Sequence, residues 1–470
     1  MLFEIDKENI EVLVRDSGRS IKVQTSNVFY RGELRRDYPV MERGEGVYIY
    51  DTENNRYLDA MSGIAVVNIG YGVQEVVHAI TEQVKKLPFC FTVRFTSQEQ
   101  EELAKRIAGL SPRGLNKVWF SLAGHEAIEC AIKVARQFHV EAGNSSKFKV
   151  VSRWQSYHGS SLGALSVSGA ASWRKNYAPL LMEFPKIAPV NCYRCPFKKS
   201  YPGCDLDCAY DLERVVRHSG GQDISAFIAE PVVAGSQGAT VPPPEYFKII
   251  RSICDRYDIL LIVDEVFSGN GRTGKFFAIE HWDVIPDIIA TSKGIAGGYI
   301  PLGVTVIHER IYDAIYQGSG RFVHGVTFSG YPPSCAAGVA VLDYMEKNDL
   351  VERAAQMGEY LMKKLAPLAD FPVVGQIRGK GLLIGIEFVA DRITKEPFEP
   401  AVGFAKKVVA AAFKKGLLVQ PGSGCADGVR GDHILICPPF TISKTEADQI
   451  VEILGEAFRE VGREIKNPKS

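Results

Sequence analysis

Short apolar runs without polar alternation recur through the middle of the chain, and stretches with helical spacing separate them. A strand that is buried on both faces of a sheet reads in this way, because neither face exposes polar side chains to water. Such strands, alternating with helices, are typical of a mostly parallel sheet covered by helices on both sides. The pattern predicts strands near Val118, Val150, Ala226, Ile259 and Asp287. We therefore expect a large α/β domain over about residues 75–330.

The remaining parts of the chain have a different pattern. After about residue 335, helical stretches flank short apolar runs at 382–388 and 433–437, which predicts a smaller α+β domain over residues 331–470. Ser443 and Glu446 form a capping-box pattern before a closing helix. Residues 1–74 are expected to pack with this smaller domain.

The charge balance argues against partners that an electrostatic field would attract. The 470 residues include 55 Lys plus Arg and 55 Asp plus Glu, so the zero net charge favours neither nucleic acid nor a membrane surface. Residues 1–20 do not resemble a signal peptide, and no run is apolar enough to cross a bilayer. Cysteine is too sparse for a secreted disulfide scaffold. We expect a cytoplasmic protein.

Three of the predicted strands end in an ionisable residue. Glu230 follows one apolar run, Asp264 follows the next, and Lys293 comes shortly after a third. The carboxyl ends of parallel strands meet at one edge of the sheet, where ligands of open α/β sheets bind. Taken singly, each charge could simply reach solvent. Together they indicate a charged cluster that serves a ligand.

A lysine beside an aspartate at such an edge suits pyridoxal phosphate. This cofactor binds a lysine amine as a Schiff base, and an aspartate commonly pairs with its pyridinium nitrogen. The loop formed by Ala123, Gly124 and His125 opens onto a helix expected over about residues 126–139. A helix N-terminus offers free N–H groups to a phosphate, although an ordinary strand-to-helix turn would read the same way.

With these residues in view, the sequence resembles the class III aminotransferases, which belong to the pyridoxal-phosphate fold type I group. The resemblance covers nearly the whole chain, and its motifs run in the family's order. They are Gly46-Val-Tyr-Ile-Tyr-Asp51, Tyr57-Leu-Asp59, Gly70-Tyr-Gly72, Gly124-His-Glu-Ala127, Tyr157-His-Gly159, Glu230-Pro-Val232, Asp264-Glu-Val266, Gly271-Arg-Thr-Gly274, Pro286-Asp287, Ser292-Lys293, His324-Gly-Val-Thr327 and Arg378-Gly-Lys-Gly-Leu382.

The resemblance implies a catalytic set and a set of residues around the cofactor. Lys293 would form the Schiff base and later act as the base for the proton shift, Asp264 would pair with the ring nitrogen, and Tyr157 would stack on one face of the ring. The other implied cofactor-binding residues are Ala123, Gly124, His125, His158, Glu230, Val266 and Thr327. Thr327 would bind the phosphate of the neighbouring subunit, which implies a homodimer with an active site shared across the interface.

The sequence also departs from the family's usual pattern. Ala123 and His125 replace hydroxyl side chains at the phosphate cup, which leaves that contribution to the backbone or to His125. Ala65 stands where amine-type members carry a tryptophan, which would enlarge the substrate pocket. Leu435 replaces an arginine found in members that act on ornithine or 4-aminobutyrate.

These departures resemble the ω-amino acid and amine:pyruvate branch of the family. In that branch an arginine from a mobile loop binds the substrate carboxylate, and Arg430 is the nearest match. A planar guanidinium suits a carboxylate, although Arg430 also reads as a solvated loop residue. Arg378 is a second candidate that more readily braces the small domain.

The implied reaction moves an amino group from a primary amine or an (ω-)amino acid to a 2-oxo acid such as pyruvate or 2-oxoglutarate, in two half-reactions. Racemisation, 1,2-amino migration and decarboxylating transamination share the same cofactor site and stay open as alternatives. A non-catalytic scaffold that binds the cofactor is a further alternative, and the altered phosphate cup is its only support.

Four cysteines cluster in an excursion at about residues 190–210. Cys192 and Cys195, then Cys204 and Cys208, have the spacing of metal-ligand pairs. The spacing is compatible with a structural zinc site or an iron–sulfur cluster, and two disulfides or four free thiols are the alternatives.

Overall fold

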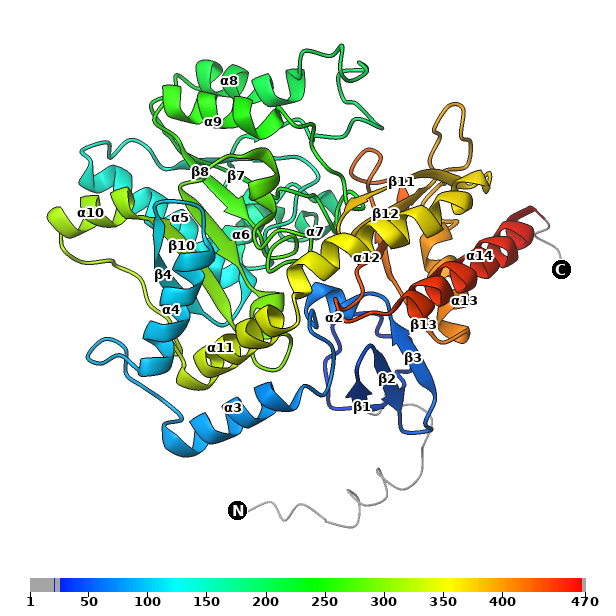
Figure 1. Cartoon of the computed structure of the whole chain (residues 1–470). Helices are drawn as coiled ribbons and strands as arrows, with labels where there is room; N and C mark the ends of the chain where they lie inside the picture. The colour runs from blue at the N-terminus through cyan, green and yellow to red at the C-terminus, as the bar shows by residue number, and fades with distance from the viewer. Residues whose placement is uncertain (1–20, 22–25, 467–470) are drawn as a thin grey trace, which may run out of the picture.

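The computed structural model describes residue 21 and residues 26–466, so the expectation about a signal peptide lies outside the described residues. These residues form three sheets with helices packed around them, and Figure 1 shows the largest sheet at the centre of one lobe. None of the helices described is long and apolar enough to cross a membrane.

The largest sheet has seven strands in the order β4-β10-β9-β8-β7-β5-β6. The strands from β9 to β6 pair in parallel, and β10 runs antiparallel to both of its neighbours. This confirms the predicted fold, with a mostly parallel sheet. The bounds are β4 Leu115–Ser121, β5 Lys149–Arg153, β6 Lys186–Ile187, β7 Ile224–Ala229, β8 Leu260–Asp264, β9 Ile288–Thr291 and β10 Gly303–His308.

Alternate residues of the central strands enter two different cores, which explains why the runs are apolar throughout. Ile228 and Ile262 pack with α5 (Gly124–Glu141) on one face. Phe227 and Leu261 pack with α8 (Asp207–His218) and α9 (Tyr246–Arg256) on the other. The remaining helices before the small domain are α2 Ser62–Ala65, α3 Gln74–Lys86, α4 Gln98–Leu110, α6 Leu162–Val167, α7 Ala171–Arg174, α10 Glu309–Gln317 and α11 Pro332–Lys347.

The small domain is an antiparallel sheet with helices packed on it, in the order β11-β12-β15-β14. The predicted capping box forms, because Ser443 N donates to Glu446 Oε2 at 2.7 Å and Glu446 N donates to Ser443 Oγ at 3.2 Å. The bounds are β11 Val374–Lys380, β12 Leu383–Phe388, β14 Gln420–Ser423, β15 Asp432–Ile436, α12 Leu350–Leu365, α13 Phe404–Lys414 and α14 Lys444–Lys466.

A third sheet combines strands from the N-terminal and C-terminal parts of the chain. Its strands are β1 Met41–Glu45, β2 Tyr48–Asp51, β3 Arg56–Asp59 and β13 Leu417–Leu418, and β13 pairs in parallel with β3. The segment before residue 74 therefore contacts a strand of the C-terminal part. The three domain boundaries and the packing of residues 1–74 with the small domain stay a prediction.

Candidate active site

The three ionisable residues at the strand ends lie together at one edge of the central sheet. Glu230 follows β7, Asp264 is the last residue of β8, and Lys293 lies just after β9 at the start of a 3-10 turn. Asp264 and Lys293 both lie close enough to act on the pKa of Glu230. The parallel pairing of β7, β8 and β9 places these strand ends side by side.

Lys293 has the properties of an amine that can exchange protons near neutral pH. Burial lowers its pKa to about 8, against the raising effect of nearby groups that include Asp264. Its Nζ lies 3.8 Å from the centre of the Phe267 ring. Its φ of 51° lies in the left-handed region, which is costly for a residue with a Cβ and is common at functional sites.

Asp264 is 4% exposed and is held by two donors. The Nδ1–H of His158 donates to Oδ2 at 2.7 Å, and the backbone N–H of Val266 donates to Oδ1 at 3.0 Å. An ionised carboxylate only accepts hydrogen bonds, so this contact also sets the tautomer of His158. The arrangement fixes the direction in which Asp264 presents its charge.

Glu230 is a buried carboxyl group beside Asp264. Burial and then the charge of Asp264 raise the pKa of Glu230 to about 8, so the carboxyl is mostly neutral at pH 7. The backbone N–H of Tyr157 donates to it, and its Oε2 has no partner within the described part of the chain. Two neighbouring acids with such different environments are typical of sites that divide roles between them.

Arg153 is a site residue that the sequence analysis missed. It ends β5, is fully buried, and donates from Nη2 to the carbonyl oxygen of Glu230 at 2.5 Å. The rule that found Glu230 and Asp264 could have found it too, because Arg153 is also an ionisable residue at a strand end.

The predicted phosphate cup has free backbone donors and little space for side chains. Helix α5 begins at Gly124, and its N-cap Ala123 makes no side-chain capping bond. A Cβ on Gly124 would lie 2.8 Å from Val266 Cγ1, so glycine is needed at this close approach. The cup thus adjoins Val266, which the resemblance places against the cofactor ring.

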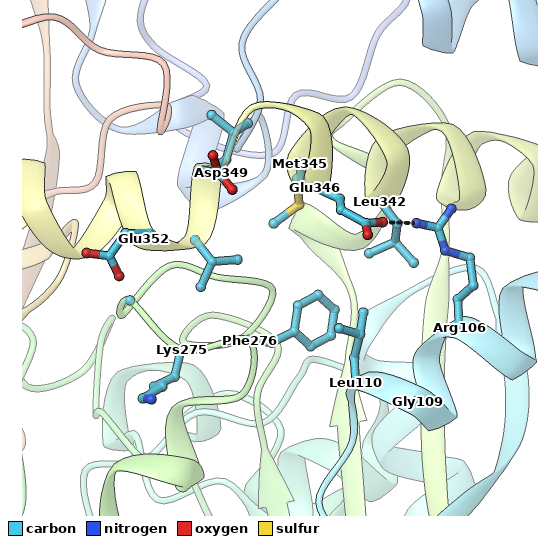
Figure 2. A pocket seen from close by; sticks show the side chains of 13 residues that line it. Arg106, Gly109, Leu110, Lys275, Phe276, Leu342, Met345, Glu346, Asp349 and Glu352 are labelled. Carbon is cyan, nitrogen blue, oxygen red and sulfur yellow. Dashed lines mark hydrogen bonds and ion pairs between the residues drawn. The ribbon is translucent and has the colours of Figure 1, made fainter.

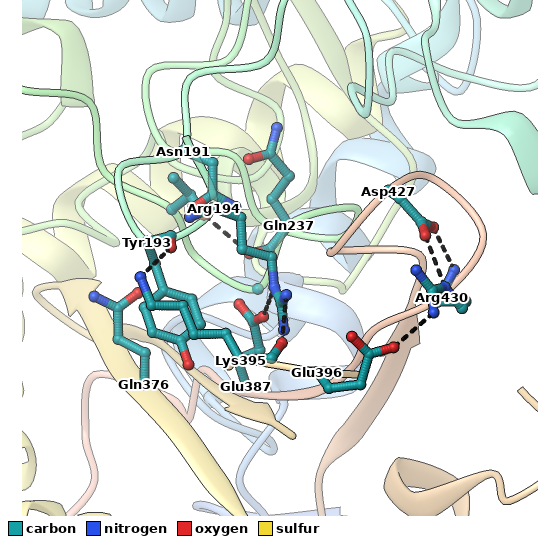
Figure 3. Close-up of polar contacts among 12 residues, drawn as sticks. Asn191, Tyr193, Arg194, Gln237, Gln376, Glu387, Lys395, Glu396, Asp427 and Arg430 are labelled. Atoms are coloured by element: carbon teal, nitrogen blue, oxygen red, sulfur yellow. Dashed lines mark hydrogen bonds and ion pairs between the residues drawn. The ribbon is translucent and has the colours of Figure 1, made fainter. Parts of the chain in front are cut away.

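Four further predicted residues differ in how far they are exposed. His125 is exposed in the first turn of α5, and Thr327 lies on an exposed turn without a side-chain hydrogen bond to any described residue. Ala65 is buried in the core of the large domain, at the end of α2. Arg430 is half-buried and forms ion pairs with Asp427 and Glu396, as Figure 3 shows.

Arg378 braces two parts of the molecule. Its Nη1 pairs with the buried carboxylate of Glu387 at 2.6 Å, its Nε donates to the carbonyl oxygen of Gly238 at 2.9 Å, and Nη2 donates to the carbonyl oxygen of Gln237. This agrees with the bracing role that the sequence analysis favoured over substrate binding.

The structure does not support the metal site that the cysteine spacing allows. Within residue 21 and residues 26–466, no group of three or more His, Cys, Asp or Glu side chains is placed to hold a metal ion, and all four thiols are free. Cys204 instead packs in the apolar core of the large domain. Burial and the neighbouring thiols raise the pKa of Cys208 to about 12, so this thiol keeps its proton.

One sizeable cavity lies apart from the cluster. It measures about 620 Å³ and lies between α4, the ends of α11 and α12, and the segment around Phe276. Figure 2 shows Leu110, Phe276 and Met345 on its apolar side and Glu346 and Arg106 at its rim. None of the predicted site residues lines it, so its volume does not locate the chemistry.

The comparisons with known proteins agree with this geometry. The family described as "Aminotransferase class-III" matches residues 33–458. The uncharacterised aminotransferase YodT of Bacillus subtilis is 38% identical over 94% of this chain and 99% of its own length. The chain belongs to the class III aminotransferase family.

Two further members of this family are informative about chemistry. A putrescine–pyruvate aminotransferase of Pseudomonas aeruginosa is 34% identical over 88% of this chain and 89% of its own. A PLP-bound amine transaminase from an uncultivated Pseudomonas species is 36% identical, with a TM-score of 0.86 over 93% of this chain and 98% of that one.

Class III aminotransferases use pyridoxal phosphate, and the residues of this chain fit that group. The site offers an aspartate held in one orientation, a helix N-terminus with uncapped N–H groups, and a lysine amine whose pKa burial lowers to about 8. Glu230 Oε2 and His158 Nε2 are buried atoms without a partner in the part of the chain that the structure describes, which leaves polar groups for a ligand to satisfy.

Proposed function

We propose that this class III aminotransferase transfers an amino group from a primary amine or an (ω-)amino acid to a 2-oxo acid such as pyruvate or 2-oxoglutarate. The observation that carries the proposal is the Lys293 amine, with its pKa lowered to about 8, beside the fixed carboxylate of Asp264. The relatives named for an amine and for putrescine with pyruvate support this choice of substrates.

Pyridoxal phosphate, when bound, supplies a carbonyl group that condenses with amines and a ring that accepts electrons. Lys293 then holds or moves a proton at Nζ, which a pKa of about 8 permits near neutral pH. Asp264 would pair with the ring nitrogen, and His158 keeps that carboxylate in place. Glu230, neutral at pH 7, adds no second charge next to it.

The remaining contacts would orient the cofactor. Gly124 and His125 would donate backbone N–H groups to the phosphate from the start of α5. Tyr157 and Val266 would pack on opposite faces of the ring, and the Tyr157 ring already lies 5.1 Å from that of Trp173.

Arg430 is the arginine that we propose for substrate carboxylates. Arg378 is a poor candidate, because its nitrogens are engaged by Glu387 and by two carbonyl groups. Arg430 lies on an exposed loop, and its pairs with Asp427 and Glu396, both at 2.9 Å, must open before it binds another carboxylate. Exposed ion pairs of this kind contribute little to stability, so a substrate can replace them.

A homodimer completes the proposed site. The segment between α3 and α4 exposes Phe91, Val93 and Phe95, and Phe89 packs edge-on against Phe328, the neighbour of Thr327. Exposed apolar clusters of this kind mark protein interfaces. Sedimentation equilibrium at micromolar concentration is expected to give twice the chain mass, and a monomeric mass would contradict this assembly.

The test is the visible absorbance of the purified protein with a panel of amines and 2-oxo acids. The wild-type protein should carry a cofactor band that one amine bleaches and one 2-oxo acid restores. Lys293→Ala should lose turnover by about 10³-fold or more. Lys275→Ala, which removes an exposed lysine of the large cavity, should keep it. Substantial turnover in Lys293→Ala would overturn the proposal.

A further inference from the structure

The cysteine-containing excursion reaches a buried carboxylate of the small domain. Arg194, between Cys192 and Cys195, donates from Nε to Oε1 of Glu387 and from Nη1 to the carbonyl oxygen of Lys395 at 2.8 Å. Its backbone N–H is held by the Asn191 side chain at 3.0 Å. Figure 3 shows Arg194 and Glu387 meeting beneath the excursion.

Glu387 binds two arginines from different parts of the chain. Its side chain is fully buried on β12, and it takes Arg194 on one oxygen and Arg378 on the other. Burial raises the pKa of Glu387, but Arg378 and Arg194 outweigh this effect and hold the pKa below its usual range. A buried carboxylate between two arginines fixes the orientation of both guanidinium groups.

Arg378 also binds the loop that follows Glu230. Its other nitrogens donate to the carbonyl oxygens of Gln237 and Gly238. The side chains of Ser236 and Gln237 in turn donate to the carbonyl oxygen of Gln155. The loop is thus held from the small domain on one side and contacts Gln155 on the other.

Gln155 lies two residues before Tyr157 and is held in a left-handed conformation with a φ of 55°. Its side chain donates to the carbonyl oxygen of Gly424 at 2.8 Å, and its backbone N–H donates to that of Gly169 at 3.1 Å. A non-glycine residue keeps such a conformation only when its surroundings over-determine it. The orientation of Tyr157 therefore depends on the contacts that Gln155 makes.

We propose that Arg194 is a positioning residue for the cofactor-stacking side of the active site. Through Glu387 it holds Arg378 against the loop of Gln237, and this loop holds the segment that carries Tyr157. The inference rests on the proposed function, because it takes Tyr157 to stack on pyridoxal phosphate. It gives the excursion a role in which its arginine, not its cysteines, matters for the reaction.

A double-mutant cycle with Arg194→Ala and Glu387→Gln tests the proposal. Each single variant is expected to lower kcat/KM about fivefold and to weaken the visible circular dichroism of the bound cofactor, because Tyr157 loses its fixed orientation. The double variant should be no worse than Glu387→Gln alone, since Arg194 acts through that carboxylate. If Arg194→Ala does not fold, Arg194→Lys, which keeps the charge without the fork of donors, takes its place.

Lys199→Ala is the matched control. It removes a cation from the same excursion and breaks an ion pair of 2.7 Å with Asp207, with no connection to Glu387. It should keep the wild-type kcat/KM and cofactor dichroism. An Arg194 variant that melts at a lower temperature but matches wild type in kcat/KM and cofactor dichroism would show a merely structural role and overturn the proposal. A double variant whose loss of kcat/KM equals the product of the two single losses would also overturn it.

The failure of this inference is distinguishable from failure of the proposed function. A wild-type protein that binds pyridoxal phosphate but converts no amine would overturn the proposed reaction. In that case, the dissociation constant for pyridoxal phosphate would be measured for each variant of the cycle instead of kcat/KM. Equal constants for wild type and Arg194→Ala would overturn the positioning role, whatever the activity of the wild type.

Discussion

The strand-end cluster and the cysteine-containing excursion both gather reactive side chains, but they do so in different ways. Asp264 and Lys293 lie on neighbouring strands of one sheet, and buried hydrogen bonds fix Asp264. The four cysteines lie on a loop and at the start of α8, and Cys204 turns into the apolar core while Cys192 is exposed.

The two groups of residues differ in whether paired strands position them. Parallel strands place their carboxyl ends at a common edge, so the position of a strand-end residue follows from the pairing of its strand. A loop supplies no such register. The spacing of the cysteines alone therefore does not fix where each thiol points, although the thiols lie close enough to raise the pKa of Cys208. Spacing is strong evidence for a site when a rigid element carries it and weak evidence when a loop carries it.

The largest loss of activity is expected at Asp264, at the end of a paired strand. Asp264→Asn keeps the shape of the side chain and an oxygen for the Nδ1–H of His158, but it removes the charge. Loss of one preorganised electrostatic group costs about 10²- to 10³-fold in kcat, measured at saturating pyridoxal phosphate. Asp283→Asn is a control at an exposed left-handed position that asparagine tolerates. A kcat within fivefold of wild type for Asp264→Asn would show that the charge of Asp264 is not needed for the reaction.

The pH profile is expected to report the environment of Lys293. Its amine is protonated below a pKa of about 8 and neutral above it, so kcat should rise with pH and level off above about 8. Each pH unit below that point should cost about tenfold. Glu230 has a pKa of about 8 and is mostly neutral over this limb, so in Glu230→Gln the rising limb should keep its position. A limb that moves in either direction would contradict this arrangement.

The local patterns of the sequence predicted most strands of the large sheet. Apolar runs predicted β5, β7, β8 and β9, because each run is buried on both faces. Strand β10 was missed because Thr305 interrupts its apolar run, and the structure explains that residue by a hydrogen bond from its hydroxyl to the carbonyl oxygen of Ala127 at 3.0 Å.

Contacts between distant segments could not be predicted. Glu387 and Arg194 are 193 positions apart, and their pairing depends on how β12 lies against the excursion, which no local pattern encodes. Gln155 and Gln237 read as ordinary polar loop residues for the same reason. Arg153 is different, because its position at the end of β5 was visible in the sequence.

The smallest effects are expected at the exposed cysteines, and they separate two accounts of the excursion. A four-thiolate metal site would make all four cysteines comparably important, because losing any ligand opens the site. The structure makes them unequal, since Cys192 is exposed whereas Cys204 is buried in apolar surroundings. Cys192→Ser should therefore change the unfolding free energy by about 0.5 kcal/mol or less. Cys204→Ser buries a hydroxyl among apolar groups and should cost about 1–3 kcal/mol.

Dialysis against a chelator should leave the thermal midpoint of the wild-type protein unchanged. Denaturant unfolding of the two serine variants, followed by circular dichroism, measures the difference between Cys192 and Cys204. Equal and large losses in both variants, together with a midpoint that falls on chelation, would restore the metal account that the spacing of the cysteines first indicated. Unequal losses would show that burial in the core, not ligation, sets the importance of each thiol.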